Sequence, residues 1–287
     1  MKAKNKPVGI KHNVHKKKRE KRIGLAVIVA ILIAIVLISG FLINSMLNQP
    51  STSQPVNSTA EPKAAIVDQL SLTCPNQTFI ETATNILKQA GYTVDYYSGE
   101  KVTVEFYRNL PTRNYALIIL RVHSTAAALE GEEFVETGVS FFTSESYSQF
   151  KYVWEQLTDQ LAIASYTMPE PPYYFAIFPK FVTSSMKGKF QNSTIIMMGC
   201  EGLNNTKMAE AFIQKGAKAY ISWSQSVSAD HTDIATANLL QHMLIQKQTI
   251  EQAVENTMKE IGPDPTDNSF LLYYPTEVGK ETIEDAS

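Results

Sequence analysis

The chain has 287 residues, of which 44% are hydrophobic, so it carries enough apolar side chains for one large core or two small ones. Its two cysteines exclude a disulfide framework. Residues 1–22 hold ten Lys/Arg and one Glu, which leaves 16 basic and 27 acidic residues and a net charge of −11 beyond them. This acidic remainder argues against nucleic-acid binding outside the basic N-terminal tail.

An uncharged apolar run of 21 residues follows at positions 23–43, IGLAVIVAILIAIVLISGFLI. As a helix it would rise ~31 Å, about the thickness of a hydrocarbon core. Residues 1–22 should then stay in the cytoplasm by the positive-inside rule. We therefore expect a single-pass transmembrane helix in the cell membrane, with the lipid bilayer as a partner. A flexible stalk rich in Ser, Thr, Pro and Asn follows at 44–63 and leads to a domain outside the cell.

From residue 64 onward, short apolar runs typical of buried strands alternate with helical patterns. The predicted strands are 64–70, 92–97, 115–123, 193–199, 217–223 and 269–274. The predicted helices are 78–91, 103–111, 149–164, 180–190, 206–216, 233–246 and 249–262. Alternation of this kind implies an α/β fold, in which helices cover a mostly parallel central sheet over residues 64–275.

The middle of this domain, about residues 130–180, has a different pattern. Two β-prone runs over 132–145 predict a hairpin, and the prolines and aromatics of 169–179 predict an extended segment. We therefore expect a β-rich insertion here. At the other end, residues 276–287 are acidic and predicted to form a disordered tail.

Reactive side chains follow three of the predicted strands: Cys74, His123 and Cys200. Because the carboxyl ends of neighbouring parallel strands gather at one edge, His123 and Cys200 should meet there. A thiol beside an imidazole ionises more readily, and the imidazole can later protonate a leaving amine. Gly199 permits close approach of the backbone, and Ser124 and Gly199 are the backbone positions expected to form an oxyanion site.

The segments ALIILRVHST and TIIMMGCEG resemble the two signatures of the caspase–gingipain class (clan CD) of cysteine peptidases. The resemblance covers roughly residues 64–260. It implies a caspase-like α/β/α sandwich, a His123–Cys200 dyad, a peptide or protein substrate, and no metal or organic cofactor. Ser124 stands where the family often has Gly. The 77-residue separation of the dyad exceeds the ~50 residues of caspases, which indicates a divergent relative.

The resemblance also implies a substrate pocket after the fifth strand, in SWSQSVSADHTD. Ser222 and Trp223 would form its walls, and Asp230 or Asp233 would attract a Lys or Arg side chain. In a second interpretation Asp230 caps the helix that follows. Glu201, beside the expected nucleophile, would either select a basic group or disfavour the thiolate.

Two alternatives stay open at this point. The domain could be a catalytically inactive module that binds a peptide or a partner protein. A Cys74–Cys200 disulfide, which needs Cα atoms within about 7 Å, would enforce that state. Metal-dependent hydrolysis through His123 and His231 is less favoured, because no ligand pair has zinc-site spacing.

Overall fold

The computed structural model describes residues 61–126, 138–166 and 170–283. The predicted cytoplasmic tail, transmembrane helix and nearly all of the stalk lie outside the described residues, as does the first half of the predicted hairpin. The described residues belong to one compact unit, Ala60–Ser287. Within this part of the chain, no helix has the length and apolar character needed to cross a membrane.

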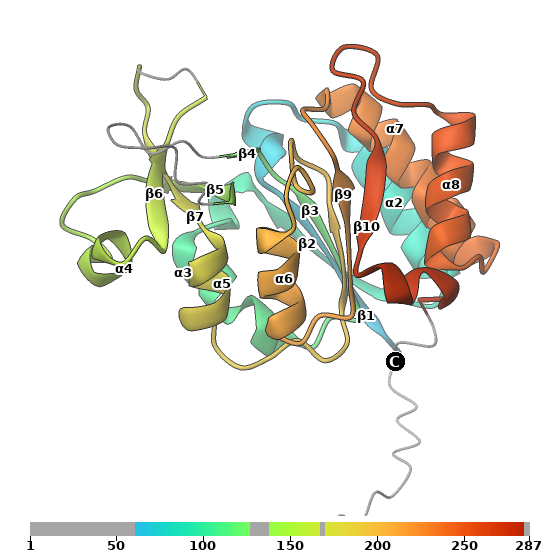
Figure 1. The fold of residues 1–287 in the computed structure, drawn as a ribbon, viewed down its shortest axis with the longest axis horizontal. Helices are drawn as coiled ribbons and strands as arrows, with labels where there is room; N and C mark the ends of the chain where they lie inside the picture. Colours follow the sequence, from blue (N-terminus) through green and yellow to red (C-terminus); the bar gives the residue numbers. More distant parts are fainter. Residues whose placement is uncertain (1–60, 127–137, 167–169, 284–287) are drawn as a thin grey trace, which may run out of the picture. The chain divides into compact units, whose positions relative to one another are not determined.

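A six-stranded sheet forms the centre of this unit, in the order β10-β9-β8-β3-β1-β2 (Figure 1). Its strands are β1 (Lys63–Asp68), β2 (Thr93–Ser98), β3 (Leu117–Arg121), β8 (Thr194–Met197), β9 (Ala219–Trp223) and β10 (Leu271–Tyr274). All neighbours are parallel except β10, which runs antiparallel to β9. The predicted mostly parallel sheet is therefore confirmed, and β3 is buried along its whole length.

Helices cover both faces of the sheet because its central strands are apolar on both sides (Figure 1). Leu117 and Ile119 of β3 belong to one core, whereas Ile118 and Leu120 belong to the other. The first core includes side chains of α2 (Gln77–Gln89), α7 (Ala229–Leu240) and α8 (Ile250–Glu260). The second includes side chains of α3 (Val104–Asn109), α5 (Pro179–Ser184) and α6 (Lys207–Gln214). Single helical turns occur at Gln69–Leu72, Gly99–Lys101, Leu110–Arg113 and Gln241–Ile245.

A second, antiparallel sheet lies beside the first, in the order β4-β5-β7-β6. Its strands are β4 (Ser124–Ala126), β5 (Val139–Ser146), β6 (Leu161–Ala164) and β7 (Tyr174–Ile177). The predicted helix over 149–164 is wrong for most of its length, because only α4 (Val153–Leu157) is helical. The chain turns through Asp159, which has a φ of +55°, and β6 then pairs with β7. Strand pairing has overridden the local helical pattern.

The N-termini of two helices are capped by side chains. At the start of α8, Thr249 and Gln252 form a capping box. At the start of α2, the Asn76 side chain accepts a hydrogen bond from the Phe79 amide at 3.1 Å. The expected disordered tail is wrong for residues 276–283: a helical turn spans Thr276–Lys280, and Ile283 is buried.

Candidate functional site

The order of the strands reverses between β1 and β3, and in open α/β sheets ligands bind outside the carboxyl ends of the strands at such a point. His123 follows β3, and Cys200 follows its parallel neighbour β8. The register pairs Leu117 with Thr194 and Leu120 with Met197. If this register is continued for three more residues, position 123 lies opposite position 200. Both residues therefore lie at the carboxyl-terminal end of the sheet.

Gly199 lets the two strand ends approach each other closely. A Cβ atom there would overlap with the carbonyl oxygen of Val122 and lie 2.5 Å from the Ser124 hydroxyl. With glycine at position 199, the Ser124 hydroxyl donates a hydrogen bond to the Cys200 carbonyl at 2.5 Å. The expected close backbone approach is therefore confirmed. The Gly199 amide, however, is directed at the Met197 sulfur, 3.4 Å away, so it is not free for an oxyanion in this conformation.

The His123 side chain is held by the segment that follows β1. Its backbone amide donates to the Gln69 side-chain oxygen at 3.0 Å, and its Nε2 lies 2.9 Å from the Thr73 hydroxyl. The imidazole packs against the ring of Tyr166, with 4.6 Å between centroids, and that phenol accepts a hydrogen bond from Gln69. The ring is thus fixed on the side of β1, although β8 lies on the other side of β3.

A buried guanidinium lies two residues before the histidine. Arg121 donates to both Asp233 oxygens at 2.7 and 2.8 Å and to Asp68 at 2.8 Å, and these side chains are nearly inaccessible to solvent. It also donates to the Cys74 carbonyl at 2.8 Å. Burial opposes its charge, but the bonds to Asp233 and Asp68 outweigh this and raise the pKa of Arg121 above its usual value. In the sequence, the one signal of this cluster is a charged residue at the end of an apolar strand, and it did not predict the two aspartate partners.

The electrostatic surroundings keep both reactive groups neutral. Burial, together with the positive charge of Arg121, lowers the pKa of His123 to about 4. Burial also raises the pKa of the Cys200 thiol, and the negative charge of Glu201 acts in the same direction. At neutral pH the structure therefore favours a thiol and an uncharged imidazole over an ion pair.

The Cys200 sulfur contacts the loop after β9, where it lies 3.6 Å from the Val227 carbonyl. Among the described residues, no hydrogen bond joins the Cys200 thiol and the His123 imidazole. Cys74 is exposed and Cys200 is half-buried, and both are free thiols, so the Cys74–Cys200 disulfide is not formed.

The expected walls of a substrate pocket are buried in the core. Ser222 is inaccessible and donates to the Met197 carbonyl at 2.8 Å. Trp223 is also fully buried, and its indole donates to Thr232 at 2.9 Å. Both side chains point into the layers of the fold, so neither lines an open pocket, and these two assignments are corrected.

The two expected acidic selectors lie in different surroundings. Asp233 is buried and bonded to Arg121, which also pairs with Asp68, so it is not available to a substrate. Asp230 is exposed in the first turn of α7, where a negative charge is favourable. Ser228 occupies the N-cap position of that helix, so the alternative of Asp230 as the cap is also corrected.

Glu201 makes a contact that the sequence did not predict. Its backbone has a φ of +61°, and its carboxylate accepts a hydrogen bond from the Ala126 amide of β4 at 2.5 Å. The carboxylate thus joins the residue after Cys200 to the strand after His123. Within the described residues, no group of His, Cys, Asp and Glu side chains is arranged to hold a metal ion.

Comparison of this chain with known proteins finds a similar solved structure but no matching family. No family model matches the sequence, and no curated protein matches it. Among solved structures, the chain is similar to gingipain R, described as an Arg-specific cysteine proteinase, with 13% sequence identity and a TM-score of 0.42. The match covers 70% of this chain and 41% of that one, so this chain spans less than half of its length. A similarity at this level carries no inference about activity.

Proposed function

We propose that this chain is a membrane-anchored, extracytoplasmic protein with a caspase-like α/β/α fold. In this proposal it hydrolyses peptide bonds with His123 and Cys200. The observation that carries it is the β3–β8 register, which, extended beyond its last pair, sets these two positions opposite each other at the carboxyl-terminal end of the sheet, next to the β1–β3 point where the strand order reverses. The anchor is the apolar run 23–43, and the substrate is a peptide or a protein.

The proposed reaction begins from neutral groups. An imidazole whose pKa is about 4 is unprotonated at pH 7 and is therefore in the form that accepts a proton. It would take the proton of the Cys200 thiol as the sulfur attacks the peptide carbonyl, and would then give that proton to the leaving amine. Water would release the acyl group from sulfur and restore the thiol. This sequence requires His123 to leave Thr73, and Cys200 to leave Val227.

A second candidate is a catalytically inactive module of the same fold that binds a peptide or a partner protein. The observation that favours it is that both groups are bonded elsewhere and that the pKa of the Cys200 thiol is raised. A thiol with a raised pKa holds little thiolate at pH 7 and reacts slowly with a carbonyl.

The two candidates differ in how Cys200 responds to the loss of His123. The full-length chain is treated with thiol-reactive peptide probes that have basic, acidic or apolar ends, and labelling is located by mass spectrometry. Peptidase function predicts probe-dependent labelling of Cys200 that His123→Ala suppresses, whereas exposed Cys74 is labelled equally in both proteins. Labelling of Cys200 that is unchanged by His123→Ala would favour the binding module.

A further inference from the structure

Strand β4 is an edge strand of the antiparallel sheet, and it begins directly after His123. β5 pairs with it on one side, and the described residues contain no strand on its other side. The Phe142 amide of β5 donates to the His123 carbonyl at 2.9 Å. Because the bonding side alternates along an antiparallel ladder, the backbone groups of Ser124 and Ala126 face away from β5. The amide of Ala126, an exposed residue, therefore lies on the open edge of the sheet.

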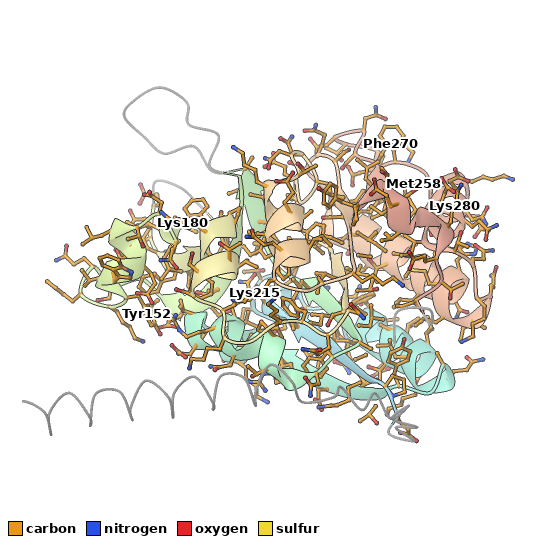
Figure 2. All side chains as sticks on the ribbon, turned by 60° about the horizontal axis from the view of Figure 1, so that its bottom comes forward. Tyr152, Lys180, Lys215, Met258, Phe270 and Lys280 are labelled. Atoms are coloured by element: carbon orange, nitrogen blue, oxygen red, sulfur yellow. The ribbon has the colours of Figure 1, made fainter. Side chains whose placement is uncertain are left out.

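The strand that pairs with β4 has its own edges and one face occupied. β5 pairs with β7 along its other edge. A Cβ atom added at Gly138, just before β5, would lie 3.0 Å from Pro179 of α5, and Phe141 of β5 stacks on Phe212 of α6. Figure 2 shows α5, marked by Lys180, beside α6. Among the described strands of this sheet, β4 is therefore the one with an open backbone edge beside the histidine.

A carboxylate from the residue after Cys200 occupies the open amide. Glu201 accepts the hydrogen bond of the Ala126 amide at 2.5 Å, and it is only half-buried. Its backbone has a φ of +61°, and its own amide donates to the Gln225 carbonyl at 2.9 Å. Left-handed backbone is unfavourable for a residue with a side chain, so the surrounding contacts hold Glu201 in this position.

A carboxylate oxygen and a peptide carbonyl oxygen are interchangeable partners for a backbone amide. Both accept its hydrogen bond, and an extended peptide binds an open strand edge through such bonds. The Ala126 amide lies one side chain's length from the residue next to Cys200. Successive residues of an extended peptide are ~3.3 Å apart, so a peptide seated at Cys200 has a further main-chain carbonyl within reach of this amide.

We propose that the Ala126 amide is a binding subsite for a main-chain carbonyl of an extended peptide, and that the Glu201 carboxylate occupies this subsite until a peptide displaces it. Because Glu201 is half-buried, the displaced carboxylate can reach water and is not left as a buried, unpaired charge. The inference rests on the proposed binding of a peptide at Cys200, and it applies equally to a peptidase and to a binding module.

Reagents with one shared electrophile separate binding at this subsite from the reactivity of the thiol. The full-length chain is treated with iodoacetamide, or with alanine tripeptides that carry an iodoacetamide group at the N-terminal or the C-terminal end. The rate of Cys200 alkylation is followed by mass spectrometry. The ratio of the tripeptide rate to the iodoacetamide rate cancels changes in the thiol pKa, which act on each reagent alike. An alkyl iodoacetamide of the tripeptide's length, which has no main-chain carbonyls, is the reagent control.

The variants empty the subsite, keep it occupied or remove its donor. Glu201→Ala empties it, and we expect the ratio for at least one tripeptide to rise about threefold or more, as one net hydrogen bond would give. Glu201→Gln keeps an acceptor oxygen but removes the charge that raises the pKa of Cys200, so all reagents should accelerate together. Glu201→Ala/Ala126→Pro removes the N–H at a strand edge where proline is tolerated, so the ratio should return to the wild-type value.

Three outcomes would overturn the inference. The first is a ratio that Glu201→Ala leaves unchanged. The second is an equal gain for the alkyl reagent, which would mean that the substitution only opened space. The third is a gain that the Ala126→Pro double variant retains, which would exclude this amide as the donor. Cys200 rates that His123→Ala leaves unchanged, together with the gain in Glu201→Ala, would instead refute the peptidase and support the subsite.

Discussion

Replacing Asp233 with alanine tests whether the buried ion cluster supports the edge of the sheet. In the native protein this carboxylate accepts two hydrogen bonds from Arg121 and a third from Asn76 at 2.9 Å. The substitution leaves the guanidinium with Asp68 and the Cys74 carbonyl as its partners. Arg121 keeps Asp68 as its ion-pair partner, but its buried Nε–H loses its acceptor, which typically costs about 1–3 kcal/mol and more for a charged donor.

The matched control is Asp230→Ala, three residues earlier on the same helix. Asp230 is exposed, so its loss should cost less than about 1 kcal/mol. Urea unfolding of the fragment 60–287, followed by far-ultraviolet circular dichroism at pH 7, gives both values. We expect a lower unfolding midpoint for Asp233→Ala with an unchanged slope. A loss of stability equal to that of the control would refute the reasoning that this cluster is structural.

Three further outcomes follow from the same contacts. Gly199→Ala should cost about 1–3 kcal/mol through overlap with the facing strand end, and an unchanged midpoint in urea would contradict this. In the native protein iodoacetamide should modify exposed Cys74 before half-buried Cys200, whose pKa is raised, and both at similar rates in urea. The pKa of His123 is lowered from 6.5 to about 4, so the unfolded chain takes up its proton first as the pH falls through this window. Stability should therefore fall more between pH 6.5 and pH 4 in the wild type than in His123→Asn, and parallel losses would argue against the buried neutral imidazole.

Local sequence patterns were sufficient for the regular elements of the main sheet. The alternation of short apolar runs with helical periods located six parallel or edge strands, because each pattern reports which side chains must leave water. It also identified β3 and β8 as buried neighbours whose ends carry His123 and Cys200. The helical period of residues 149–164 predicted one helix, which is wrong for most of that range. Pairing between β6 and β7 makes residues 161–164 a strand.

Orientation and partner choice were decided only by the tertiary structure. The family resemblance implied that Ser222, Trp223 and Asp233 contribute to a substrate pocket, whereas in the fold the first two are buried in the core and the third binds Arg121. The Arg121–Asp233 bond joins residues 112 positions apart, and no local pattern encodes it. The sequence by itself determined which strands end in a thiol and an imidazole. The packed fold determined that each group is neutral and bonded to another neighbour, because burial and the charge of Arg121 arise only when distant segments meet.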